Sequence, residues 1–151
     1  MARQLRFAAI CALIACASGV SAQDRLFVGK GEYEGKPVWE LLSGCSGFAQ
    51  AVAAYFKTHG ALKDHKQWMG AAVESYSAAQ YRLGLDRQIE DDAATRALIN
   101  PIVEMVQAQY AGKLAAIDPT SGTQEAFTAE SLILHGTYAQ MCFAASFQAG
   151  E

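Results

Sequence analysis

Apolar residues recur at alternating steps of three and four along most of this chain, and this spacing restricts its possible folds more than any other feature. Residues 37–59 illustrate it, with Val38, Leu42, Cys45 and Val52 on one stripe. A stripe with this period covers one face of an α-helix. The body of the chain has no alternation of apolar and polar residues of the kind that predicts strands. We therefore expect an all-α protein.

Helix start and stop signals divide the pattern into segments. The first predicted helix spans 37–59 and the second spans 64–83. The second is opened by the capping pair Asp64 and Gln67 and is closed by Gly84, a residue type that commonly follows the last turn of a helix.

A third helix is predicted to open at the acidic residues 90–92, whose charges favour a helix N-terminus. Pro101 lies inside it, and proline removes a backbone donor and clashes with the preceding turn. We expect this helix to be kinked or split at Pro101, with Asn100 capping the second piece. A fourth helix is predicted over 123–147. Four amphipathic helices with short loops favour an antiparallel four-helix bundle, formed by 37–151 as one domain.

Residues 1–22 have the pattern of a secretory signal peptide. Two arginines are followed by an apolar run too short to span a membrane and by small residues that end at Ala22. Cleavage after Ala22 predicts a periplasmic or secreted protein. The alternative is a lipobox that ends at Cys16, which would make the protein a lipoprotein anchored through that residue. The glycine-rich residues 23–36 have no helical period, so we expect a short extended N-terminal arm there.

The charge balance excludes some classes of partner. Removal of residues 1–22 leaves 129 of the 151 residues, enough for one domain with a core, and lowers Lys+Arg from 12 to 10 against 15 Asp+Glu. A net charge near −5 argues against a nucleic-acid or anionic-membrane partner, which would select a basic face. No further segment approaches the ~20 apolar residues of a transmembrane helix.

Cysteine usage predicts one covalent cross-link. Cys11 and Cys16 lie in the predicted leader, so the remaining chain holds only Cys45 and Cys142. Two cysteines in an oxidising compartment usually pair. Cys45 lies about eight residues after the start of the first predicted helix, and Cys142 about five before the end of the fourth, so antiparallel neighbours would bring them to similar heights. We expect a Cys45–Cys142 disulfide, with two buried thiols as the alternative.

The segment Gly44-Cys45-Ser46-Gly47 resembles a nucleophile flanked by glycines, but its spacing argues against catalysis. A nucleophile elbow needs Gly-x-Ser-x-Gly between a strand and a helix, whereas Gly47 directly follows Ser46 within a predicted helix. The competing interpretation is a Cys45 thiol activated by His135. We expect no catalytic residue here, and small residues that let a partner helix approach.

Histidines suggest a metal site that the pattern does not complete. His59 and His65 lie on either side of one loop, and Asp64 or Glu74 could add a carboxylate. Two histidines without a third convincing ligand are usually solvated helix ends. We expect no metal site.

Some helical bundles bind haem or a di-iron centre, and the sequence can be checked for the ligand motifs of these cofactors. The chain has no Cys-x-x-Cys-His for covalent attachment and no Glu-x-x-His for a di-iron site. An axial pair of Met69 or Met105 with His135 would be needed, yet methionine in a helical stripe is usually a core residue. We expect no cofactor.

These patterns predict a non-enzymatic binding or interaction module with a protein partner in the cell envelope. The alternative function is a bundle that binds haem or a transition metal. Partner identity and oligomeric state are left open by the sequence.

Overall fold

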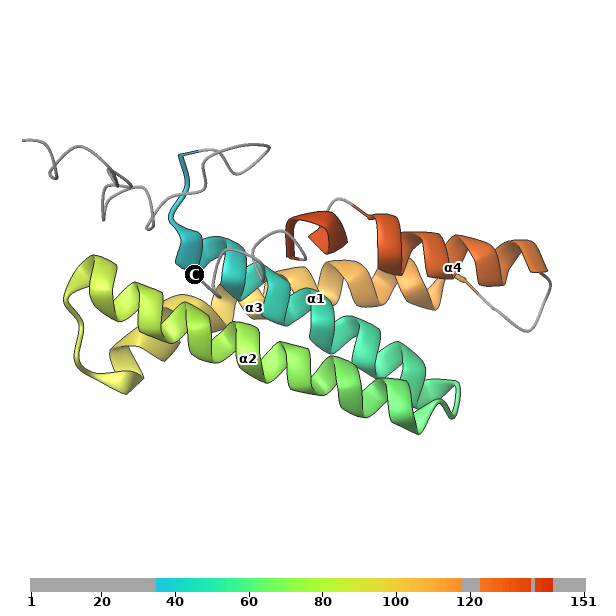
Figure 1. Cartoon of the computed structure of the whole chain (residues 1–151), viewed down its shortest axis with the longest axis horizontal. Helices are drawn as coiled ribbons and strands as arrows, with labels where there is room; N and C mark the ends of the chain where they lie inside the picture. Colours follow the sequence, from blue (N-terminus) through green and yellow to red (C-terminus); the bar gives the residue numbers. More distant parts are fainter. Residues whose placement is uncertain (1–34, 118–122, 137, 143–151) are drawn as a thin grey trace, which may run out of the picture.

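A computed structural model describes residues 35–117, 123–136 and 138–142, and these residues are mostly helical. The four helices are α1 (Val38–Thr58), α2 (Leu62–Arg87), α3 (Asp92–Ala115) and α4 (Thr123–His135), shown in Figure 1. The described residues contain no strand, which confirms the all-α prediction.

Helix α1 is the centre of the fold. It packs along both α2 and α3, which touch each other less (Figure 1). Between Trp39 and Ala53 all but two of its residues are buried, on every side of the helix. We expected only one stripe of residues 37–59 to be buried, and the buried surface of α1 is wider than that stripe. A helix that has apolar or small residues on all sides can be buried on all sides by neighbouring helices. A charged face would have to stay in contact with water.

Two glycines allow other segments to approach α1 closely. A Cβ on Gly47 would collide with the backbone carbonyl oxygen of Val103 and would lie 3.0 Å from the backbone nitrogen of Gln107, both in α3. A Cβ on Gly44 would lie 2.6 Å from the ring of Tyr138. Because glycine has no side chain, α3 and the segment with Tyr138 can approach α1 closely. This close approach is the packing role that we expected for the small residues beside Cys45.

Two groups of side chains form the core. One joins α1 to α3 and α4, with Phe48 packed against Tyr110 at a centroid distance of 4.8 Å and Ile133 included. The other joins α1 to α2 and α3 and contains Leu83 and Ile99. Because α1 contributes to both, it links the two groups into one domain.

The first predicted helix, 37–59, agrees with α1 to within one residue at each end, but the second was predicted too short. α2 runs past Gly84 to Arg87, and the positive φ of 53° at the next residue, Gln88, ends the helix. A glycine inside a helix costs only about 1 kcal/mol, and the fully buried Leu83 beside it favours continuation. The predicted capping pair was also wrong, because α2 begins at Leu62 without a side-chain cap.

Of the two effects predicted for Pro101, a kink or a split, the split was wrong, because α3 is one continuous helix through that residue. Asn100 does not cap a second piece; its Oδ1 accepts a hydrogen bond of 2.6 Å from the Tyr76 hydroxyl on α2. Buried Ile99 and Val103 hold both sides of the proline against the core. The predicted acidic opening is correct, since the Asp91 carboxylate accepts from the backbone N–H of Ala93 at 2.9 Å.

The fourth helix is shorter than predicted. α4 ends at His135, and after a bend at Gly136 a separate helical turn, 138–142, carries Cys142 (Figure 1). The rest of the predicted fourth helix, 143–147, lies outside the described residues, as do the predicted signal peptide and nearly all of the predicted arm. No described helix has both the length and the apolar character needed to cross a membrane.

Candidate functional site

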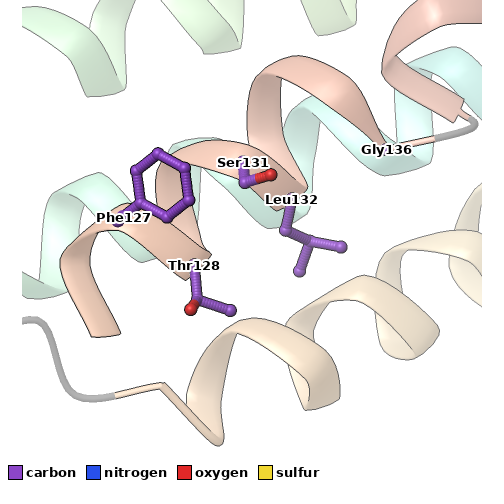
Figure 2. Close-up of a pocket in the computed structure, with 5 residues that line it drawn as sticks. All are labelled: Phe127, Thr128, Ser131, Leu132 and Gly136. Carbon is purple, nitrogen blue, oxygen red and sulfur yellow. The ribbon is translucent and has the colours of Figure 1, made fainter. Parts of the chain in front are cut away.

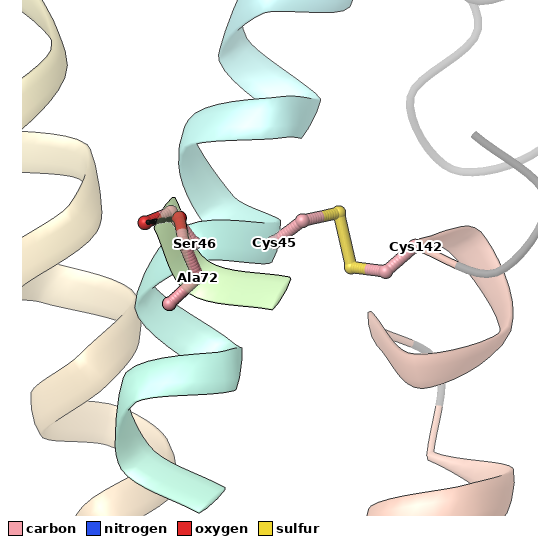
Figure 3. Close-up of a disulfide and its surroundings, with 4 residues drawn as sticks. All are labelled: Cys45, Ser46, Ala72 and Cys142. Carbon is pink, nitrogen blue, oxygen red and sulfur yellow. Dashed lines mark hydrogen bonds between the residues drawn. A yellow bond between two sulfur atoms is a disulfide. The ribbon is translucent and has the colours of Figure 1, made fainter. Parts of the chain in front are cut away.

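The disulfide predicted from the sequence is present. Cys45 on α1 is bonded to Cys142, with their Cα atoms 5.5 Å apart (Figure 3). Cys45 is buried. In this oxidised state its sulfur is covalently committed, so it is not the thiolate that a cysteine nucleophile requires. The side chain of His135, the base in the competing interpretation, lies outside the described residues.

Ser46 points away from the disulfide, toward α2 (Figure 3). Its side chain is 0% exposed, and its hydroxyl donates a 2.9 Å hydrogen bond to the backbone carbonyl of Ala72. Gln50 donates to the same hydroxyl at 3.4 Å. A nucleophile must reach substrate, whereas this hydroxyl is enclosed between two helices. The geometry gives Ser46 a packing role that joins α1 to α2.

The two histidines near the α1–α2 loop are held by backbone carbonyls. Nδ1 of His59 lies 2.8 Å from the carbonyl oxygen of Tyr55, and Nδ1 of His65 lies 2.9 Å from that of Ala53. A carbonyl only accepts, so each Nδ1 carries the proton. Among the described residues no cluster of three or more His, Cys, Asp or Glu side chains could hold a metal ion.

Both methionines considered as haem ligands lie at the surface, and the prediction that they belong to the core was wrong. Met105 on α3 is 62% exposed and Met69 on α2 is also exposed. On α2 the buried positions are Ala72, Ala79 and Leu83, so Met69 lies at the edge of the stripe that faces α1. A position at the edge of a stripe cannot be assigned to core or surface by period alone.

Two shallow hollows open on the described surface. The larger, about 350 Å³, runs along one side of α4 and is lined by Phe127, Thr128, Ser131, Leu132 and Gly136 (Figure 2). The smaller, about 170 Å³, lies between α1 and α2 and is lined by Gln50, Met69, Ala72, Val73, Tyr76 and Ser77. Among the described residues, neither lining contains a charged residue, a histidine or a cysteine, and Tyr76 is the only side chain in them that can ionise.

The solvent side of α2 exposes several apolar residues. Five residues at steps of four form a row that we call the α2 outer face: Met69, Val73, Ser77, Tyr81 and Leu85. All five are exposed, with Val73 at 60%, Tyr81 at 66% and Leu85 at 52%. Glu74 is the only charged residue among the exposed positions from 69 to 85. The outer side of a surface helix is normally polar, so an apolar row there calls for an explanation.

This face was not predicted from the sequence, because a single apolar stripe was expected on each helix. A signal was present: Val73, Tyr81 and Leu85 lie off the stripe of Ala72, Ala79 and Leu83, yet they too are apolar or aromatic. A helix with two apolar stripes predicts burial on one side and a second contact on the other.

Comparisons of the chain with protein-family models, with curated proteins and with solved structures give no match. The functional argument therefore rests on the residues and geometry described above.

Proposed function

We propose that this protein is an exported, non-enzymatic interaction module that binds a protein partner through the α2 outer face. Its scaffold is an antiparallel four-helix bundle in which the Cys45–Cys142 disulfide ties the end of the chain to α1. It acts in the periplasm or outside the cell, after removal of residues 1–22.

The observation that carries the proposal is the exposed apolar row on α2. Full burial of a Val, Leu or aromatic side chain contributes about 1.5–3 kcal/mol relative to exposure. In the isolated chain Val73, Tyr81 and Leu85 forgo most of that stabilisation. Contiguous apolar residues with polar surroundings are typical of interaction sites, whereas single exposed ones are ordinary. Tyr81 and Leu85 are neighbours at a spacing of four, and Val73 lies eight residues before Tyr81 on the same row, with Ser77 between them.

Two features support the proposed scaffold and its location. Ile133 on α4 and Ala139 on the following turn pack in the same core group as Phe48 on α1, which suits a fourth bundle helix laid over α1. The disulfide suits an oxidising compartment. It agrees with the leader-like pattern of residues 1–22.

The test is site-specific photocross-linking in living cells. A photoreactive residue replaces Val73 in one variant and Met105, an equally exposed apolar residue on α3, in the control variant. We expect a defined protein adduct from position 73 and none from position 105. Adding Tyr81→Lys to the first variant should abolish the adduct. No adduct from position 73, or an adduct that survives Tyr81→Lys, would refute binding through this face.

A further inference from the structure

We propose that the partner of the α2 outer face is a second copy of this chain, which docks in the antiparallel direction about a twofold axis near Ser77. This inference rests on the proposed function, because it names the occupant of the same face.

The α2 outer face is nearly symmetric about Ser77. Val73 and Tyr81 lie four residues before and after it, and Met69 and Leu85 lie eight residues before and after it. A small residue is therefore flanked by two large ones on each side. A twofold interface uses the same surface on both subunits, so residue i contacts j while j contacts i. In antiparallel docking the face can meet this condition, with Val73 of each copy at the level of Tyr81 of the other.

The two halves of the face also complement each other in shape. The hollow of about 170 Å³ lies in the N-terminal half, beside Met69, Val73 and Ser77. The C-terminal half carries Tyr81, an aromatic side chain that extends into solvent. The hollow is smaller than the ~300–1,000 Å³ of small-molecule sites, and its size suits one side chain.

Only one docking direction uses this complementarity. Antiparallel docking about Ser77 brings Tyr81 of each copy to the level of Val73 in the other, where the hollow lies. Parallel docking would instead place Tyr81 beside Tyr81 and leave both hollows unfilled. Tyrosines seated in apolar hollows are typical binding hot spots, and the twofold axis would create two of them in each dimer.

Helix packing rules give the crossing geometry. The row at steps of four is a ridge of α2, and the hollow lies in the groove between this ridge and the next, which contains Ala72 and Tyr76. Two such ridges interdigitate at about −50°. The small side chain of Ser77 near the crossing lets the helices approach. At this angle the two helices touch over only a few turns. The area buried is therefore smaller than the ~800 Å² per partner of a standard interface. We expect weak association, in which the fraction of dimer rises with protein concentration.

Charge at the two ends of α2 favours the same direction. Residues 62–67 carry a net charge of +1, from two lysines and one aspartate with His65 taken as neutral. Residues 86–96, at the end of α2 and the start of α3, carry −2, from four carboxylates, Arg87 and Arg96, the ion-pair partner of Asp92. Antiparallel docking brings each end toward the opposite charge on the other copy. This attraction acts over distance and is screened by salt, so it orients the encounter more than it strengthens the contact.

The first experiment measures the mass of the purified, oxidised protein by sedimentation equilibrium over about 1–500 µM, a range that brackets the micromolar dissociation constants of small interfaces. We expect the average mass to approach twice the monomer mass as concentration rises. Val73→Lys should weaken association at least tenfold, while the matched control Met105→Lys should leave it unchanged. Circular dichroism and melting temperature verify that both variants are folded.

A second experiment tests the docking direction by oxidative cross-linking of folded cysteine variants. A mixture of Val73→Cys and Tyr81→Cys should form the mixed disulfide dimer in larger yield than either variant alone. Preferred 73–73 and 81–81 cross-links would overturn the antiparallel arrangement.

Monomer mass at every concentration, or association unaffected by Val73→Lys, would overturn self-association through this face. If the protein is monomeric while the photoreactive residue at position 73 still captures a different protein, the second copy is refuted and the proposed function stands.

Discussion

Substitution of Gly47 by alanine is the most direct test of how α1 and α3 pack. The added Cβ would collide with the carbonyl oxygen of Val103 and approach the amide nitrogen of Gln107. Both atoms belong to the backbone of α3, so no side-chain rotation can relieve the contact and the two helices must move apart. Overpacking of this kind typically costs about 1–3 kcal/mol.

The intrinsic preference of helices for alanine acts in the opposite direction. Replacing a helical glycine by alanine contributes about 0.5–1 kcal/mol where space is open. For Gly47→Ala we therefore expect a net loss of up to about 2.5 kcal/mol. For a domain of this size this loss lowers the melting temperature by up to roughly 10 °C.

Gly112→Ala is the matched control. Gly112 lies inside α3, is exposed, and has no atom within 4 Å of an added Cβ. The helix-propensity gain is common to both variants, so the difference between their unfolding free energies isolates the overpacking cost of about 1–3 kcal/mol. Urea unfolding of the oxidised proteins measures that difference. Equal stability of the two variants, or a Gly47→Ala protein more stable than the wild type, would refute the close approach of α1 to α3.

Three further predictions concern the cross-link, the GCSG serine and export. Cys45→Ser and Cys142→Ser should each lose about 2–5 kcal/mol of stability by thermal or urea unfolding, and the double variant should be little worse because both changes delete the same bond. Two reactive thiols in the oxidised, unfolded wild type would contradict this. Ser46→Ala should lose about 0.5–1.5 kcal/mol, the net contribution of a buried hydrogen bond, while photocross-linking from the α2 outer face persists; a lost adduct in a folded variant would mean a functional serine. Mass spectrometry of the exported protein should show a chain that starts at Gln23, and a lipidated chain starting at Cys16 would instead place it on a membrane.

Secondary structure was predictable where local chemistry and core contacts agree. α1 and the start of α3 follow their sequence signals closely, because Pro37 and Gly60 lie just outside the two ends of α1 and Asp91 caps α3. The prediction failed where local and tertiary preferences oppose each other. Gly84 and Pro101 are helix breakers in isolation, yet both lie inside helices because Leu83 and Ile99 beside them are fully buried. Burial of Leu83 offsets the propensity penalty of about 1 kcal/mol for Gly84. Proline inside a helix costs about 3 kcal/mol, and the burial of both Ile99 and Val103 offsets that larger penalty.

The candidate surface was less predictable than the helices. Periodicity identifies a stripe that prefers burial, but it does not state which of two apolar stripes on α2 faces the core. Ala72, Ala79 and Leu83 pack inward. The small side chains of Ala72 and Ala79 allow the close approach in which the Ser46 hydroxyl donates to the carbonyl of Ala72. The larger Val73 and Tyr81 were therefore left outside.

The sequence by itself determined the all-α class and the pairing of Cys45 with Cys142, because helical period is a local property and only two cysteines remain outside the leader-like segment. The tertiary structure decided that α1 is enclosed on every side, that Gly47 touches the backbone of α3, and that an apolar row on α2 faces solvent. These properties depend on which helices become neighbours and how near they come. That outcome is a balance of many small packing energies summed over residues distant in the chain, and no single stretch of sequence contains it.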